Sequence, residues 1–135
     1  MIILAVILIS KKKLEWILPF FISTTAAYLI TYILKFAFAR PRPNSIEMSF
    51  LLGFNDYSFP SAHAAVAFAM LPILTKEHPK GKWVWIILAF LIAFSRIYIG
   101  VHYLSDVVAG ALIGYITGMF IINLKQRKWK LTNSK

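Results

Sequence analysis

Long apolar runs with few charges constrain the fold of this chain more than any other feature of its sequence. Four such runs follow one another, at residues 14–38, 59–74, 83–100 and 103–124. A helix needs about 20 apolar residues to cross a hydrocarbon core that is about 30 Å thick. The second run is shorter and rich in alanine, so we expect it to begin inside the membrane or to be partly covered by its neighbours.

The N-terminal residues 1–10 are also apolar, and a run of lysines at residues 11–13 follows them. At ~1.5 Å per residue, a helix of that length crosses only about half of the membrane. A signal peptide carries its basic region before the apolar run, whereas here the basic residues come after it. We therefore predict a half-span, the end of a helix whose beginning lies outside this chain.

Together these segments predict an all-α fold, a polytopic transmembrane helical bundle of four full spans plus an N-terminal half-span. A chain of 135 residues suffices for one domain, so we expect residues 1–135 to form a single membrane-embedded unit. Within it, residues 1–13 are the partial helix with its basic stop, and residues 125–135 are a basic cytoplasmic tail. The hydrophobic fraction of 59% fits this class, because soluble domains have about 45–50%.

The formal net charge of +10 would suggest a nucleic-acid partner in a soluble protein. Four alternating helices, however, place most of the 15 Lys and Arg residues on one side of the membrane, which the positive-inside rule makes cytoplasmic. We therefore expect no nucleic acid, and an integral protein of a prokaryotic plasma (inner) membrane with an extracytoplasmic active site. The sequence has no cysteine, which excludes disulfides and thiolate metal sites.

Three polar stretches reach the outer side at one level: KFAFARPRP at residues 35–43, FPSAHAA at 59–65 and SRIYIGVHYLSD at 95–106. Lys35, Arg42 and Arg96 bring three cations there, and converging cations repel one another unless an anion lies between them. Guanidinium groups bind phosphate oxygens through paired N–H donors, and a lysine adds a point charge. The set therefore favours a phosphate. Arg40 is either a loop charge or a secondary phosphate contact.

Pro60 and Ser61 predict the start of a helix, because proline is favoured in the first turn and serine at the N-cap. A helix N-terminus offers unpaired N–H groups and the positive end of its dipole, which suit a phosphate. Ser61 taken alone is more simply an N-cap. His63 lies in the same first turn and is placed to protonate a leaving oxygen and then to deprotonate a water.

His102 and Asp106 are four residues apart, so we expect them to share a helix face. A carboxylate that accepts a hydrogen bond from one ring nitrogen fixes the tautomer and leaves the other nitrogen free to attack phosphorus. The alternative is a helix-stabilising pair at the membrane interface. Because the cations of the protein can neutralise the phosphate charge, and no carboxylate cluster suits magnesium, we expect no metal and no cofactor.

These residues resemble the type-2 phosphatidic acid phosphatase superfamily, which includes vanadium-dependent haloperoxidases and bacterial acid phosphatases. Its signature K-x6-R-P, P-S-G-H and S-R-x5-H-x3-D is matched by Lys35–Arg42-Pro43, Pro60-Ser61-Ala62-His63 and Ser95-Arg96–His102–Asp106. The resemblance covers residues 35–106 and implies a helical bundle, a lipid-phosphate substrate and a phosphohistidine on His102. It also implies three catalytic residues (His102, His63 and Asp106) and five that bind phosphate (Lys35, Arg42, Ser61, Ala62 and Arg96).

The chain departs from the family pattern in two ways. Ala62 stands where the signature has glycine, and a methyl group is unfavourable there if the backbone needs a positive φ. We expect an ordinary helix start, where alanine fits. Membrane members of the family also commonly have about six spans, more than the four and a half predicted here.

We expect an enzyme that dephosphorylates phosphatidic acid, phosphatidylglycerol phosphate or undecaprenyl pyrophosphate. The main alternative is a truncated, catalytically weak relative that binds lipid phosphates or a membrane partner. A haloperoxidase on the same scaffold is disfavoured, because those relatives are not built as bilayer spans. The repeat of Gly110, Gly114 and Gly118 indicates close helix packing, either within the bundle or in a homodimer through the last helix.

Overall fold

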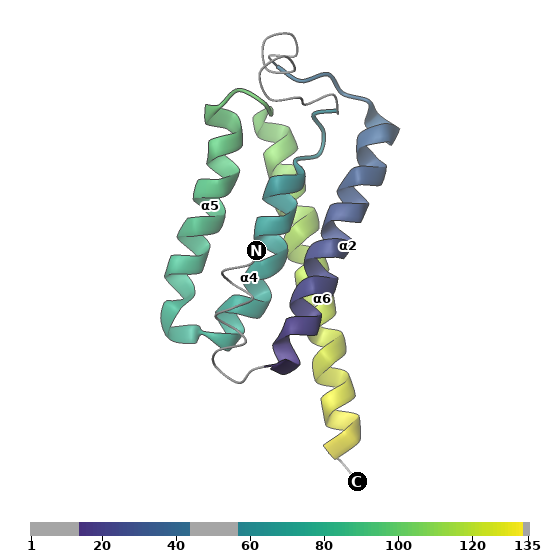
Figure 1. The fold of residues 1–135 in the computed structure, drawn as a ribbon, viewed down its shortest axis with the longest axis vertical. Coiled ribbons are helices and arrows are strands. Elements are labelled where there is room, and N and C mark those ends of the chain that lie inside the picture. Colours follow the sequence, from purple (N-terminus) through teal and green to yellow (C-terminus); the bar gives the residue numbers. More distant parts are fainter. Residues whose placement is uncertain (1–13, 44–56, 134–135) are drawn as a thin grey trace.

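The structure, a computed structural model, describes residues 14–43 and 57–133, so the predicted half-span at residues 1–13 lies outside the described residues. The described residues form four long helices and one short 3-10 helix, and they contain no strand. In chain order these elements are α2 (Leu14–Phe38), α4 (Ala62–Glu77), η1 (Pro79–Gly81), α5 (Lys82–Tyr98) and α6 (Leu104–Asn133). Successive long helices run antiparallel in one bundle (Figure 1), which confirms the all-α fold.

Three segments of the described chain are long and apolar enough to cross a membrane: Glu15–Phe38, Pro79–Tyr98 and Leu104–Arg127. The protein is therefore an integral membrane protein. Helix α4 has 16 residues, fewer than the roughly 20 that a full span needs. It contacts α2, α5 and α6, and most extensively α6, so its neighbours cover it as expected. The predicted count of four full spans plus a half-span stays a prediction.

Two helix boundaries differ from the sequence-based expectation. Helix α4 starts at Ala62 rather than at residue 59, because Pro60 and Ser61 form the entry to the helix and not its first turn. Helix α6 continues to Asn133, through most of the predicted basic tail. Lysine, arginine and glutamine are good helix formers, and neither glycine nor proline interrupts residues 119–133.

Helices α6 and α4 approach each other closely and share the most extensive contact in the bundle. A Cβ atom added at Gly110 would lie 2.3 Å from the carbonyl oxygen of Ser61, and one added at Gly114 would lie 2.0 Å from that of Ala65. Gly118 continues the row against Ala69. In lipid, small residues let backbones approach to gain van der Waals contact. The glycine row is thus used inside the bundle, and a homodimer through α6, still a prediction, would need another face.

Helix α2 is fixed on the other side of α4 by both apolar and polar contacts. Phe20 is fully buried with Ile73 and Ile122 in one cluster, and the buried hydroxyl of Ser23 donates a hydrogen bond of 2.9 Å to the carbonyl oxygen of Ala69. These contacts set the register of α2 against α4. Lys35, in the last turn of α2, is thereby held at the same end of the bundle as the start of α4.

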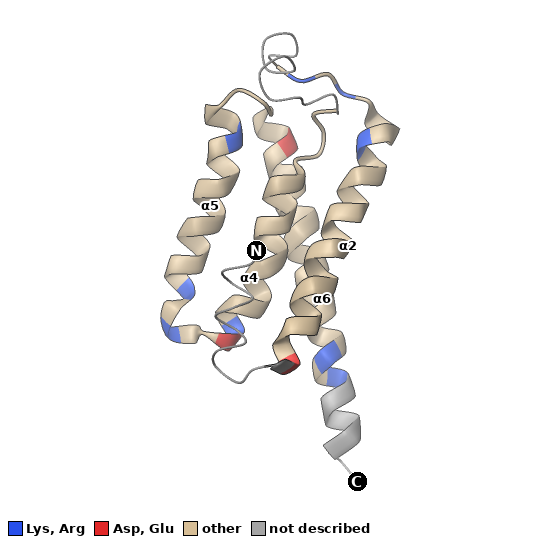
Figure 2. Ribbon diagram, in the orientation of Figure 1, with Lys and Arg blue, Asp and Glu red and all other residues tan. Residues whose placement is uncertain are grey.

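Charged residues gather at the two ends of the bundle and leave the middle apolar (Figure 2). One end, where α2 and α5 stop and α4 and α6 begin, carries Lys35, Arg40, Arg42 and Arg96. The opposite end carries the other Lys and Arg side chains that the structure describes, namely Lys76, Lys80, Lys82, Lys125 and Arg127. The predicted segregation of cations between the two ends is confirmed for these residues.

The α4–α6 contact predicts that Gly114→Val destabilises the protein. The added side chain would overlap the backbone of Ala65, and overpacking of a close contact costs about 1–3 kcal/mol. Thermal unfolding in detergent micelles should show a lower midpoint for the variant. Gly81→Ala is the matched control, because a Cβ atom there would lie 3.6 Å from the indole nitrogen of Trp85, an ordinary contact. Equal midpoints for both variants would contradict the prediction.

Candidate active site

His102 lies in the turn between α5 and α6, and its side chain is buried. The turn is tight because Gly100 takes a left-handed conformation with φ of 78°, which glycine adopts without steric cost. Helix α6 begins only at Leu104, so the expectation that His102 and Asp106 share a helix face is wrong. The turn itself folds the imidazole back over the first turn of α6, where Asp106 lies.

The carboxylate of Asp106 is fully buried, and its Oδ2 atom has three neighbours. The Tyr103 N–H donates to it at 2.9 Å, the Ser58 hydroxyl donates a short hydrogen bond, and Nδ1 of His102 lies 3.6 Å away. The last distance is too long for a good hydrogen bond. The Ser58 oxygen is also 3.5 Å from Nδ1, so this hydroxyl lies next to both groups. Ser58 lies outside all three sequence motifs, so no signal in the sequence marks it.

The other carboxylate oxygen, Oδ1 of Asp106, is paired with Arg40. The guanidinium Nη1 lies 2.7 Å from Oδ1 and 2.7 Å from the Ser105 hydroxyl, and its carbon lies 4.0 Å from the ring centre of Tyr103. Neither interpretation of Arg40 from the sequence included this ion pair. The only signal that marked the residue was the repeated Arg-Pro in RPRP at residues 40–43.

The second ring nitrogen of His102 faces a cation. Nη1 of Arg42 lies 3.4 Å from Nε2 and donates a hydrogen bond of 3.0 Å to the carbonyl oxygen of Val101. The Lys35 ammonium donates to the carbonyl oxygen of Tyr57, and both cationic side chains are buried. The structure therefore brings four of the predicted site residues together: Lys35, Arg42, His102 and Asp106.

The surroundings of His102 disfavour its protonation. Burial, followed by the charges of Arg42 and Lys35, lowers the pKa of the imidazole from 6.5 to about 4, although Asp106 and a hydrogen bond with Ser58 oppose the shift. Desolvation and nearby cations both penalise an imidazolium ion. At neutral pH the ring is therefore uncharged, and one of its nitrogens keeps a lone pair.

Ser61 stands at the N-cap position of α4, but its hydroxyl makes no capping hydrogen bond. That oxygen is buried and has no hydrogen-bond partner among the residues that the structure describes. The Ser61 N–H donates at 2.9 Å to the main-chain carbonyl of Asp106, which ties the start of α4 to the first turn of α6. Ala62 is the first helical residue and has no positive φ, so the expectation of an ordinary helix start is confirmed.

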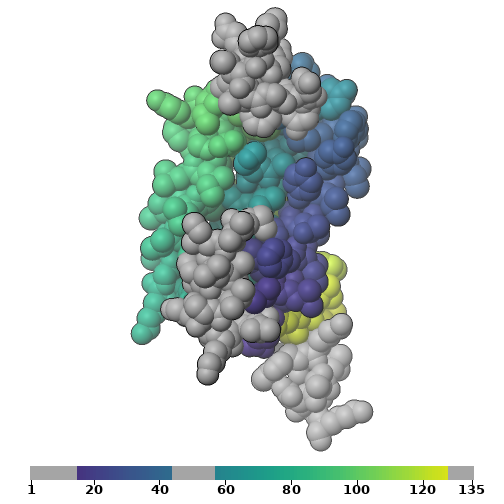
Figure 3. Space-filling model, viewed as in Figure 1, coloured from purple at the N-terminus to yellow at the C-terminus, as the bar shows by residue number. Residues whose placement is uncertain are grey.

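His63 and Arg96 lie at this end of the bundle, in the first turn of α4 and the last turn of α5. The His63 side chain is exposed, and the half-buried Arg96 donates from Nε to the Ser95 hydroxyl at 3.1 Å. His63 borders an apolar pocket of about 370 Å³ between α2, α4 and α5, which Tyr28, Met70 and Ile92 also line. On the face in Figure 3 a strip of α4 is visible between α5 and α2.

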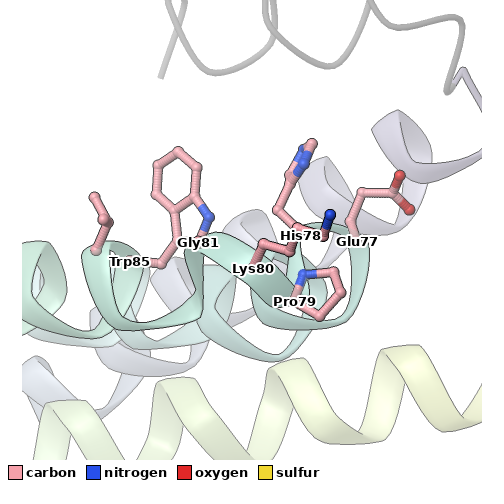
Figure 4. Close-up of a pocket in the computed structure, with 7 residues that line it drawn as sticks. Glu77, His78, Pro79, Lys80, Gly81 and Trp85 are labelled. Atoms are coloured by element: carbon pink, nitrogen blue, oxygen red, sulfur yellow. The ribbon is translucent and has the colours of Figure 1, made fainter.

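A larger pocket, of about 530 Å³, lies at the opposite end of the bundle (Figure 4). It is lined by Glu77, His78, Lys80, Trp85 and their neighbours around η1, and it contains none of the predicted site residues. His78 is half-buried there. Within residues 14–43 and 57–133, no three His, Asp or Glu side chains are grouped as a metal site would require.

Comparisons with known proteins agree with this geometry. Residues 16–130 match the family model described as the PAP2 superfamily. The chain belongs to this superfamily. The resemblance inferred from the three motifs is thereby confirmed. The PAP2 chain spans about half the length of the curated relatives it matches.

One curated relative and two solved structures show the extent of the similarity. The undecaprenyl-diphosphatase of Sulfolobus acidocaldarius is 36% identical over 114 residues, 82% of this chain and 55% of that protein. LpxE of Aquifex aeolicus superposes with a TM-score of 0.75 and 34% identity, over 89% of this chain and 74% of that one. A PAP2-type phosphatidylglycerolphosphate phosphatase from Bacillus subtilis gives a TM-score of 0.62 and 26% identity, over 82% and 59% of the two chains.

The low pKa of His102 predicts its protonation behaviour. In detergent micelles, the imidazole nitrogens of His102, labelled with ¹⁵N, should stay in the neutral form as the pH falls through 6.5 and become protonated only near pH 4. NMR measures this directly, and His102→Gln identifies the signal among the three histidines. A midpoint near 6.5, the ordinary value for histidine, would contradict the prediction that His102 is buried next to cationic side chains.

Proposed function

We propose that this PAP2 protein removes phosphate from a lipid phosphate or diphosphate through a phosphohistidine intermediate on His102. The observation that carries the proposal is the placement of the buried, neutral imidazole. One ring nitrogen faces Asp106 and Ser58, and the other faces the guanidinium of Arg42 at 3.4 Å. A phosphate bound by Arg42 would therefore lie beside the nitrogen that carries the lone pair.

In the first step, Nε2 of His102 attacks phosphorus, and the bond from phosphorus to the leaving oxygen breaks. Lys35, Arg42 and Arg96 bind the non-bridging oxygens, and the Ser61 hydroxyl and the N–H groups at the start of α4 add donors. His63 gives a proton to the leaving oxygen, which departs as the lipid alcohol or, from a diphosphate, as the lipid monophosphate.

In the second step, water attacks the phosphorus of the phosphohistidine. His63, now neutral, takes a proton from the water, and the bond between phosphorus and Nε2 breaks to release inorganic phosphate and the free imidazole. Asp106 stabilises the ring while it is positively charged. Phosphoryl transfer depends chiefly on positioning and charge neutralisation, and here cationic side chains supply both, so the reaction is proposed to need no metal.

The surroundings of the site favour a lipid over a soluble phosphate ester. Ala62 and His63, two of the proposed site residues, line the apolar pocket of about 370 Å³ between the helices. The tail of a lipid could remain in that pocket or in the bilayer while its head group reacts. Two of the relatives are named for activity on undecaprenyl diphosphate and on phosphatidylglycerolphosphate, and phosphatidic acid is a third candidate substrate.

The distribution of cations supports an orientation for the protein. The end with Lys76, Lys80, Lys82, Lys125 and Arg127 is proposed to face the cytoplasm, following the positive-inside rule. The site at the other end then faces the extracytoplasmic side of a prokaryotic plasma membrane. We assign the four cations at this end a role in the reaction, so they are not counted under the positive-inside rule.

Phosphate release from lipid micelles tests the proposed reaction. Wild type and His102→Ala are compared on a panel of phosphatidic acid, phosphatidylglycerol phosphate and undecaprenyl pyrophosphate, with EDTA present. We expect wild type to release phosphate and the variant to lose at least about a thousandfold in rate, as expected when a nucleophile is removed. The order of rates across the panel then identifies the substrate.

Several outcomes of that assay would count against the proposal. Equal release by His102→Ala would exclude the phosphohistidine, and release abolished by EDTA would exclude metal independence. No release from any lipid by folded wild-type protein would favour the alternative, a non-catalytic relative that binds lipid phosphates. In that case binding of lipid phosphate would be unaffected by His102→Ala.

Labelling of a single cysteine tests the orientation. The chain has no cysteine, so His78→Cys places one thiol at the end proposed to be cytoplasmic. An impermeant maleimide should not label it in intact cells but should label it after permeabilisation. A cysteine at Tyr98, an exposed residue at the other end, is the matched control and should be labelled in intact cells. The reverse pattern would overturn the orientation.

A further inference from the structure

Arg40 is held by the first turn of α6 although it stands at a variable position of the first motif, K-x6-R-P. Its Nη1 atom lies 2.7 Å from Oδ1 of Asp106 and 2.7 Å from the Ser105 hydroxyl. Its guanidinium lies over the Tyr103 ring, and the distance from the guanidinium carbon Cζ to the ring centre is 4.0 Å. A planar cation fixed by an ion pair, a hydrogen bond and a ring has one orientation.

The main chain of Arg40 acts on the same carboxylate from the other side. Its carbonyl oxygen accepts the Ser58 N–H at 2.7 Å, and the Ser58 hydroxyl donates to Oδ2 of Asp106. Arg40 therefore binds Oδ1 directly, and through its carbonyl it holds Ser58, whose hydroxyl donates to Oδ2. The preceding residue, Ala39, has a φ of 45°, a conformation that side-chain-bearing residues avoid unless surrounding contacts impose it.

We propose that Arg40 is a positioning residue for the reaction on His102, acting by fixing and charge-balancing the Asp106 carboxylate. This inference rests on the proposed function, because it assigns Arg40 a part in that reaction. The charged and titratable groups at this end of the bundle come from every helix. Among the described residues they are Lys35 from α2, Arg40, Arg42 and Tyr57 from the segments between α2 and α4, His63 from α4, Arg96 and Tyr98 from α5, His102 and Tyr103 from the following turn, and Asp106 from α6.

Charge balance explains why Asp106 needs this partner. A fully buried carboxylate is unfavourable unless a cation and hydrogen bonds compensate it. A neutral His102 cannot supply that charge, and the ion pair at 2.7 Å with Arg40 does. Without Arg40, the uncompensated carboxylate would favour the imidazolium form of His102, which has no lone pair for attack. Arg40 thus compensates the charge of Asp106, so that burial, Arg42 and Lys35 can keep His102 neutral.

A double-mutant cycle tests this assignment. Arg40→Gln is introduced into wild type and into Asp106→Asn, and Arg127→Gln, an exposed arginine at the other end of the bundle, is the matched control. In the wild-type background we expect kcat to fall about tenfold to a hundredfold, since a charge-assisted hydrogen bond is lost, with KM changed less than about twofold. In the Asp106→Asn background the same change should cost less than about twofold.

The NMR titration of His102 gives a second readout that needs no turnover. Arg40→Gln should raise the midpoint, because the uncompensated carboxylate favours the imidazolium, whereas in the Asp106→Asn background it should leave the midpoint unchanged. Arg40→Lys, which keeps the charge, should keep the wild-type midpoint. If wild type releases no phosphate from any lipid, the proposed function fails but these midpoints still test the link between Arg40 and Asp106.

Three results would overturn the inference. An unchanged kcat and an unchanged midpoint in Arg40→Gln would make Arg40 a loop charge. A raised KM with constant kcat would make it a contact of the substrate phosphate. Equal losses in both backgrounds would show that it acts independently of Asp106. If Arg40→Gln alone fails to fold, folding of the double variant with Asp106→Asn supports the charge balance, and failure of both contradicts it.

Discussion

The fully buried carboxylate of Asp106 is the constraint on which the rest of this end of the bundle depends. An isolated charge there would cost several kcal/mol, so the fold must bring partners to it. They come from distant parts of the chain: Arg40 from the segment after α2, Ser58 from the segment before α4, and the Tyr103 N–H from its own turn. Satisfying one carboxylate thus fixes both ends of the connection between α2 and α4.

The packing of the helices and the chemistry of the site share one interface. Gly110 and Gly114 bring α6 so close to α4 that the Ser61 N–H donates to the main-chain carbonyl of Asp106. Lipid tails are as apolar as the side chains, so this contact is favoured by close van der Waals packing rather than by exclusion of water. A shift of α6 along α4 would move the glycines away from their close contacts. The same shift would separate the Ser61 N–H from the carbonyl of Asp106.

Features set by local sequence could be predicted, and features set by contacts between distant residues could not. The apolar run at residues 14–38 gave both bounds of α2, and motif spacing identified Lys35, Arg42 and His102 as neighbours. Arg40 and Asp106 are 66 positions apart, and no periodicity links them. Ser58 belongs to no motif, so the sequence did not distinguish it from other loop serines. The end of α6 was missed because hydropathy reports where a span stops and not where a helix stops.

In the proposed reaction, the position of His102 between opposite charges would link its reactivity to the arrival of substrate. Arg42 and Lys35 on one side make the imidazole a weak base, and Asp106 on the other side favours its charged form. In the proposed reaction a phosphate bound to the cations offsets their field, so the effect of Asp106 then prevails. The ring would therefore be neutral and nucleophilic before attack, and its positive charge would be stabilised once the bond to phosphorus forms. In the proposed reaction, one arrangement of charged side chains would therefore suit both states of the ring.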